Sequence, residues 1–219
     1  MNELEQQLLE MVSLADVLVE KAVDSLASMN VDLAYEVMSS DDAIDDIDLD
    51  IEHRCLRLLA LQQPMGSDLR EIGTVLKIIT DIERIGDLSV DIAKITLKIN
   101  QELGTVDYID IPRMATIARQ MLRESVQSLM MRDVESVPSI VKLEDEVDKL
   151  YRDLRDQIHA YMRTHPEQVV AASWLILAVH HVERIADHAL NIAERVGFMV
   201  TGELKQLGSD MPTDESEGT

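Results

Sequence analysis

The chain repeats itself, and this repeat restricts the fold to two copies of one helical unit. Residues 81–94 read DIERIGDLSVDIAK and residues 181–194 read HVERIADHALNIAE, so the two segments align position by position. Residues 19–48 align in the same way, without a gap, on residues 122–151. Both copies space their apolar residues as amphipathic helices do, without the alternation of strands. Each half of the chain is therefore predicted to be a folding unit of the same design.

Six helices are predicted from the periodicity and from the breaks between its segments. Pro64 and Gly66 separate the second helix from the third, and Pro166 lies in the first turn of the last helix. Aromatic residues make up only 3% of the chain, so Leu, Ile, Val, Ala and Met must fill the core, as in helical bundles. The expected helices span residues 3–29, 32–62, 67–101, 110–132, 135–162 and 167–200.

The predicted fold class is all-α, with two tandem pseudo-symmetric three-helix bundles. Residues 1–103 are expected to form the first repeat and residues 104–201 the second, because the longest interior break lies at residues 103–112. Residues 202–219 are polar and acidic, which predicts a flexible tail.

The charge of the chain excludes several classes of partner. A net charge of −22 repels phosphate backbones and anionic lipid, so neither nucleic acid nor a membrane surface is an expected partner. The N-terminus lacks the features of a signal peptide, and no stretch approaches 18 uninterrupted apolar residues, so direct membrane insertion is not expected. Cys55, the single cysteine, gives no sign of secretion and is expected to be a core residue. The expected location is cytoplasmic.

Acidic residues lie on or beside the apolar stripes of four of these helices. Each of the four helices has a pair of acids four residues apart, which places both side chains on one face. In a three-helix unit the two acid-bearing helices touch, so four carboxylates should converge in each half. The pairs are Asp41/Asp45 with Glu83/Asp87 in the first half, and Glu144/Asp148 with Glu183/Asp187 in the second.

Four converging carboxylates require compensation by protonation, by arginine or by a cation. Arg84 and Arg184 lie about 100° around the helix from the neighbouring glutamates, so they are predicted to point elsewhere. A metal is therefore the favoured solution, and ligation by oxygen alone suits Mg, Mn, Ca or iron. Carboxylates also bridge ions, so a site could hold more than one metal. The Glu-x-x-His spacing of di-iron bundles does not occur in the sequence.

At these residues the chain closely resembles the PhoU family, the accessory and regulatory proteins of phosphate transport in bacteria and some archaea. The resemblance covers roughly residues 8–200 and therefore both repeats. The segments that carry it are QQPMGSDLR at 62–70, ITDIERIGDLSVDIAKI at 79–95 and VERIADHALNIAE at 182–194.

The resemblance implies a metal-binding adaptor with no catalytic step. In some members of the family these acidic motifs bind multinuclear clusters of iron or zinc, which here implies the same eight acids as ligands. The family links the ATPase subunit of the phosphate ABC transporter to a sensor histidine kinase, restraining phosphate uptake and starvation signalling. Asp48, Glu52 and Asp91 could extend the first site, whereas Tyr151, Arg155 and Asn191 stand at their second-half positions, so the two sites should differ.

Two other interpretations of the same residues remain open at this point. A carboxylate-bridged multinuclear centre could belong to a metalloenzyme, although no substrate-site signature accompanies it. Alternatively, the acids could be solvated or paired with arginine in a metal-free helical scaffold. In either metal-binding case, metal that bridges exposed acidic faces could support a homodimer.

Overall fold

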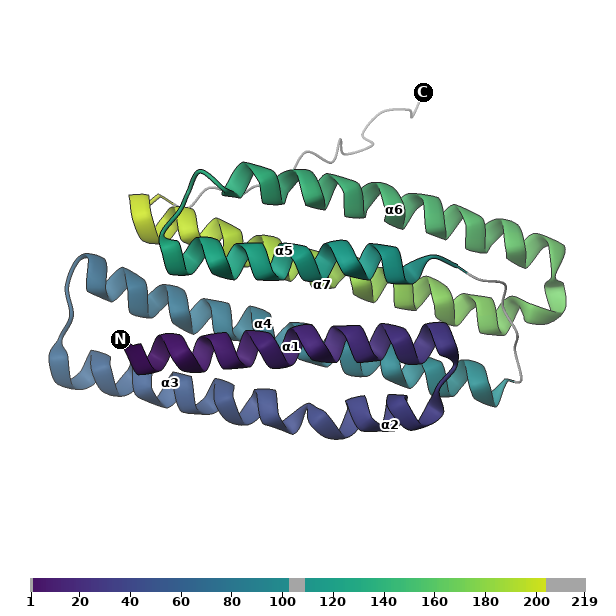
Figure 1. Cartoon of the computed structure of the whole chain (residues 1–219), viewed down its shortest axis with the longest axis horizontal. Coiled ribbons are helices and arrows are strands. Elements are labelled where there is room, and N and C mark those ends of the chain that lie inside the picture. The colour runs from purple at the N-terminus through teal and green to yellow at the C-terminus, as the bar shows by residue number, and fades with distance from the viewer. Residues whose placement is uncertain (1, 103–108, 204–219) are drawn as a thin grey trace, which may run out of the picture.

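Every element of the structure is helical, as the periodicity predicted. The computed structural model describes residues 2–102 and 109–203, and this part of the chain contains no strand (Figure 1). The elements are α1 (Asn2–Ser28), α2 (Val31–Ser40), α3 (Asp42–Gln62), α4 (Ser67–Gln101), α5 (Ile111–Met131), α6 (Val137–Thr164), the short 3₁₀ helix η1 (Pro166–Gln168) and α7 (Val169–Thr201). The prediction of a flexible tail falls mostly on residues 204–219, outside the described residues.

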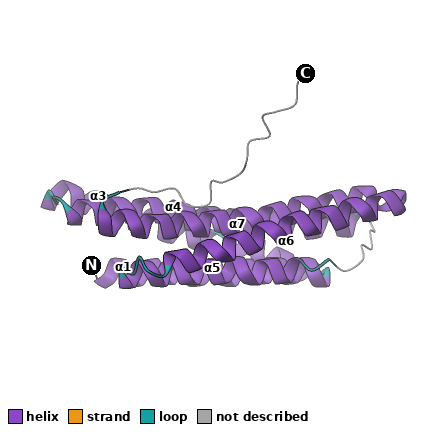
Figure 2. Cartoon of the chain, turned by 90° about the horizontal axis from the view of Figure 1, so that it is seen from above, coloured by secondary structure: helices purple, strands orange, loops and turns teal. Residues whose placement is uncertain are grey.

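The helices form two bundles that lie side by side, and the prediction of two pseudo-symmetric bundles is confirmed. The first bundle contains α1 to α4 and the second contains α5 to α7 (Figure 1). Seen from above, α1 and α5 form one layer, α3, α4 and α7 lie in the other, and α6 runs obliquely between the two (Figure 2). The two bundles meet through α4 against α7, which run in opposite directions, and through α1 against α5.

One predicted helix is divided in two. The expected helix over residues 32–62 is interrupted at Asp41, where the backbone stays near helical values (φ −68°, ψ −39°). The N–H of Ile44 donates to the carbonyl of Asp41 at 2.8 Å, whereas the N–H of Asp45 reaches the same oxygen only at 3.4 Å. The hydroxyls of Ser39 and Ser40 both donate to the carbonyl of Glu36 just before this point. The interruption therefore falls at the first acid of the first predicted site.

The core runs without a break through both bundles, and α4 and α7 occupy its centre. Burying a large aliphatic side chain contributes about 1.5–3 kcal/mol, so the apolar stripes of these two helices hold the bundles together. Cys55 is fully buried, as predicted for a core residue. Other side chains with no exposed surface include Ile78, Ile82 and Ile85 of α4 and Val182, Ile185 and Ala189 of α7.

Helix α7 has one property that the sequence analysis did not anticipate. Together with η1, over Pro166–Thr201, it is long and apolar enough to cross a membrane, with a hydropathy of 1.4 in its most apolar window. In this structure 44% of that window is buried against the other helices, as in the core helix of a bundle. Length and composition alone are weak evidence for a membrane span, and the absence of membrane insertion stays a prediction.

A partly buried ion-pair cluster joins α1 of the first bundle to α5 of the second. The guanidinium of Arg119 donates to both carboxylate oxygens of Asp16, at 2.9 and 3.0 Å, and it also lies 2.8 Å from Glu20. Arg123 donates to Asp16 at 2.8 Å. The side chains of Asp16 and Arg119 are only 16% and 17% exposed, so this pair is largely shielded from solvent. Hydrogen bonding to Asp16 raises the pKa of Arg119 above its ordinary value.

Candidate metal centres

The first group of acids lies between the α2–α3 junction and α4. We call Asp41, Asp45, Glu83 and Asp87 the first quartet. Gly86 allows the close approach of the two elements, because a Cβ atom at this position would lie 3.0 Å from Oδ1 of Asp41. The interruption at Asp41 and the glycine opposite it therefore bring the first acid directly against the backbone of α4.

The carboxylates of the first quartet act on one another electrostatically. Burial raises the pKa of Asp41 to about 6, and the charges of Asp45 and Asp87 add to this increase. Burial and neighbouring acids also raise the pKa values of Asp45 and Glu83. The contributions of Asp87 to the pKa values of Asp41 and Asp45 show that carboxylates of α4 lie near those of the α2–α3 junction. The structure thus brings the acids of the first quartet together, as the sequence predicted.

The second group of acids lies between α6 and α7. We call Glu144, Asp148, Glu183 and Asp187 the second quartet. Burial raises the pKa of Glu144 to about 7, and the charges of Asp148, Asp187 and Glu183 contribute to the increase. The pKa values of Glu183 and Asp187 are also raised, first by burial and then by acids of the same quartet. The second bundle therefore repeats the electrostatic arrangement of the first.

The acids are less deeply placed than the helical stripes suggested. The sequence analysis put them on the buried side of the helices, but none of the eight is buried. Six are partly buried, while Asp45 and Asp187 are exposed. The acids lie where the stripe meets the surface, since a carboxylate there keeps part of its hydration.

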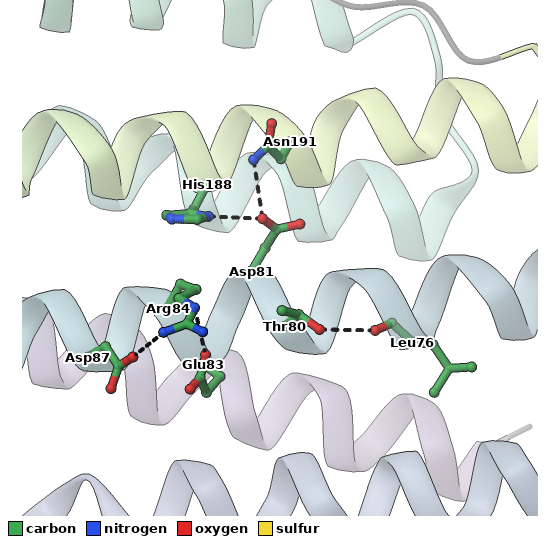
Figure 3. Close-up of polar contacts among 8 residues, drawn as sticks. All are labelled: Leu76, Thr80, Asp81, Glu83, Arg84, Asp87, His188 and Asn191. Carbon is green, nitrogen blue, oxygen red and sulfur yellow. Dashed lines mark hydrogen bonds and ion pairs between the residues drawn. The ribbon is translucent and has the colours of Figure 1, made fainter.

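The expectation that Arg84 points away from the acids is wrong. Its Nη1 donates to Oδ2 of Asp87 at 2.8 Å, and its Nε lies 3.4 Å from Oε2 of Glu83 (Figure 3). The long side chain bends along the helix surface to reach an acid three residues on, which the direction of its Cβ does not reveal. In the second bundle, Nη1 of Arg152 lies 3.6 Å from Asp148, and the charge of Arg184 lowers the pKa of Asp187. Arginine therefore neutralises part of each quartet.

The opposite side of α4 carries a separate contact to the second bundle. Asp81 points away from the first quartet and toward α7, where its Oδ1 lies 2.9 Å from Nδ1 of His188 (Figure 3). The side-chain amide of Asn191 donates to the same oxygen at 3.2 Å. The side chain of His188 is only 16% exposed. The contact links the bundles and adds no ligand to a quartet.

The residues proposed to extend the first site are placed differently from one another. Asp48 has a raised pKa because of burial and the nearby charge of Glu52, and its Oδ1 is buried without a hydrogen-bond partner. Glu52 is exposed beside it. Asp91 pairs with Lys94 at 2.9 Å, and its charge acts on His181 of α7. Asp48 therefore adds an oxygen to the first site, whereas Asp91 faces the other bundle.

The sequence analysis missed a histidine at the second quartet. Nδ1 of His180 lies 3.0 Å from Oε2 of Glu183, and this histidine opposes the increase in the pKa of Glu183 that burial causes. The ring of Tyr151 lies beside His180 at 6.2 Å, and Arg155 lies over that tyrosine. The sequence signal for this contact is the spacing His-x-x-Glu of His180 and Glu183, which is the Glu-x-x-His motif of di-iron bundles in reverse order. The second site therefore differs from the first by one nitrogen donor and fewer acids.

The chemistry of both sites fits a metal, although their side chains are not closed around one. Oxygen donors from two helices lie near one another in each quartet, and Oδ1 of Asp48 has no hydrogen-bond partner. Among the described residues, no three His, Cys, Asp or Glu side chains are already spaced to enclose an ion. To bind a cation, the carboxylates of the quartets would therefore have to rotate away from the arginines that contact them and toward the metal.

Comparison with known proteins places both halves in one family. The PhoU domain matches residues 8–96 and again residues 111–196. The phosphate-specific transport system accessory protein PhoU homolog of Aquifex aeolicus is 36% identical over 84% of this chain and 83% of its own length. The homolog of Clostridium acetobutylicum is 31% identical over 94% of this chain and 95% of its own.

Solved structures show the same architecture. The crystal structure of PhoU from Pseudomonas aeruginosa matches with a TM-score of 0.87 and 30% identity, over 92% of this chain and 97% of that one. The phosphate transport system regulatory protein PhoU from Streptococcus pneumoniae matches with a TM-score of 0.86 and 30% identity, covering 94% of this chain and 97% of that protein.

Proposed function

Since the chain belongs to the PhoU family, we propose that it is a metal-binding adaptor that negatively regulates phosphate uptake. The family consists of accessory and regulatory proteins of phosphate transport, not of enzymes, which removes the metalloenzyme interpretation. The observation that carries the metal part of the proposal is the pair of quartets, which recur at equivalent positions with pKa values raised by shared burial.

The quartets would hold the metal at the two seams where α3 meets α4 and α6 meets α7. Iron or zinc in multinuclear clusters is proposed, and the oxygen-rich donor set would also accept Mg, Mn or Ca. A bound cation would neutralise the repulsion between carboxylates. The two sites would differ in their donor atoms. The first quartet and the neighbouring Asp48 would offer oxygen alone, whereas the second quartet would offer oxygen together with a nitrogen of His180.

The proposed partners are the ATPase subunit of the phosphate ABC transporter and a sensor histidine kinase. The names of the relatives associate those proteins with a phosphate transport system, and a chain of charge −22 suits basic partner surfaces. These contacts would take place in the cytoplasm, where both partners expose their soluble parts. A homodimer bridged by metal at the exposed edges of the quartets would be compatible with the half-exposed position of these acids.

One observation favours a metal-free scaffold as the alternative. Arg84 contacts both Glu83 and Asp87, so the first quartet already has a partial counter-charge. This explanation covers the first quartet better than the second, where the nearest arginine contact is the 3.6 Å pair between Arg152 and Asp148.

Binding of the purified chain to the transporter ATPase subunit and to the cytoplasmic part of the kinase tests the adaptor role. With metal present, we expect wild-type protein to bind both subunits. The Glu83→Ala/Glu183→Ala variant should bind at least about tenfold more weakly, because without bound metal the α3–α4 and α6–α7 contacts are not held together. In cells that lack the chain, the wild-type gene should restore restraint of phosphate uptake. Failure of the metal-loaded wild type to bind either subunit would rule out the adaptor role.

A further inference from the structure

A pocket lies at one end of the molecule, well apart from the acids of the quartets. Its volume is about 240 Å³, and the N-terminal end of α1, the turn between α3 and α4, and the C-terminal ends of α5 and α7 surround it. These segments gather at the same end of the molecule, on the left in Figure 1. Gln62, Pro64 and Asp68 of the segment QQPMGSDLR form one wall. This segment carries the family resemblance but has no role in the quartets.

The most exposed large apolar side chains of the described residues are next in sequence to residues that line this pocket. Met65, Leu61 and Met131 are 84%, 71% and 67% exposed, which is more than any other large apolar residue in the described part of the chain. Each is next in sequence to a residue that lines the pocket, namely Pro64, Gln62 and Met130. Exposed apolar residues scattered singly need no explanation, but a group beside an apolar pocket marks an interaction site.

The charges at the pocket are mainly negative. Glu5, Asp68 and Glu71 line it, and Arg132 is the only cationic side chain among its lining residues in the described structure. Arg132 is already engaged, since its guanidinium lies 2.8 Å from Glu71. An occupant would therefore contact apolar side chains inside the pocket, and the acids of the lining would favour positive charge on that occupant.

The size of the pocket indicates what kind of group enters. Sites for drug-sized molecules and cofactors usually measure about 300–1,000 Å³, and this pocket is smaller. A single apolar anchor from an amphipathic helix fits such a space, with neighbouring residues of that helix at the rim. We propose that this pocket is the docking site for a basic amphipathic segment of a protein partner, with one apolar side chain inserted and Lys or Arg facing the acids.

Peptides that tile the transporter ATPase subunit and the cytoplasmic part of the sensor kinase test this docking site, which rests on the proposed adaptor role. We expect the bound peptides to combine an apolar anchor with flanking Lys or Arg. Their Kd values should rise at least about tenfold for the Leu61→Ser/Met65→Ser variant and for Asp68→Lys. Exposed Leu61 and Met65 can change without loss of the fold, and thermal melting checks each variant.

Matched controls separate the pocket from general effects of charge and hydrophobicity. Tyr35→Ser removes an exposed apolar residue of α2 at the other end of the molecule, and Asp153→Lys reverses an exposed charge on α6 (Figure 1). Both controls should bind the peptides as the wild type does. If both intact subunits bind the pocket variants as tightly as the wild type, the docking site is wrong while the adaptor role stands. If neither subunit binds the wild type, both proposals fail.

Discussion

Replacing Arg119 with methionine is expected to lower the free energy of unfolding by about 3–5 kcal/mol. The change leaves the carboxylate of Asp16 largely shielded from solvent, with only the half-exposed Arg123 as partner. It also releases Glu20, so the contact between Asp16 and Arg123 is the ion pair of this cluster that still joins α1 to α5. Urea denaturation followed by circular dichroism measures this loss.

Two further variants show whether the loss comes from the unpaired charge. Arg123→Met removes a contact that is half exposed, so it should cost only about 1 kcal/mol. Combining Arg119→Met with Asp16→Leu removes both buried charges and should recover most of the stability. If Arg119→Met costs no more than Arg123→Met, the cluster does not hold the bundles together.

Replacing Glu144 with glutamine is expected to stabilise the metal-free protein above pH 7 and to leave it unchanged below pH 4.5. The pKa of Glu144 rises from an ordinary 4.5 to about 7 in the folded protein. Between these values the folded state holds a proton that the unfolded state has released, so wild-type stability falls as the pH rises. One pKa unit corresponds to about 1.4 kcal/mol, and solvent screening reduces the total to about 2 kcal/mol.

Urea denaturation in the presence of a chelator, at several pH values, follows this difference. The stability gained by Glu144→Gln should appear through the window from pH 4.5 to 7 and stay constant above it. Asp153→Asn, an exposed change on the same helix, should show no such profile. A gain that is independent of pH would mean that repulsion within the second quartet is not its source. Metal should also bind more tightly as the pH rises toward 7, because a metal ion at the second quartet displaces the proton that Glu144 holds in the folded protein.

The periodicity and the repeat predicted the fold because helix formation and the apolar stripe depend on local spacing. The interruption at Asp41 was missed, since its backbone stays near helical values and the irregular hydrogen bonds are confined to the N–H groups of Ile44 and Asp45. The cluster of Asp16 with Arg119 was also missed. These residues take equivalent positions in the two repeats, and nothing in either helix shows that the two faces meet.

The acidic sites were predictable in position but not in environment. Pairs of acids on equivalent stripes located both quartets, because helical geometry fixes which residues share a face. The direction of Arg84 depends on torsions beyond Cβ, which sequence spacing does not constrain. The role of His180 depends on its distance from Glu183, which became visible only once α7 was placed.

Metal content tests the central claim most directly. Purified chain is dialysed against chelator-buffered Fe²⁺, Zn²⁺ or Mn²⁺, and the bound metal per chain is determined by elemental analysis. We expect metal at both quartets in the wild type, partial loss in Glu83→Ala and in Glu183→Ala, and complete loss in the double variant. A wild-type chain that holds no stoichiometric metal after this reconstitution, or a double variant that holds as much as the wild type, would contradict the account.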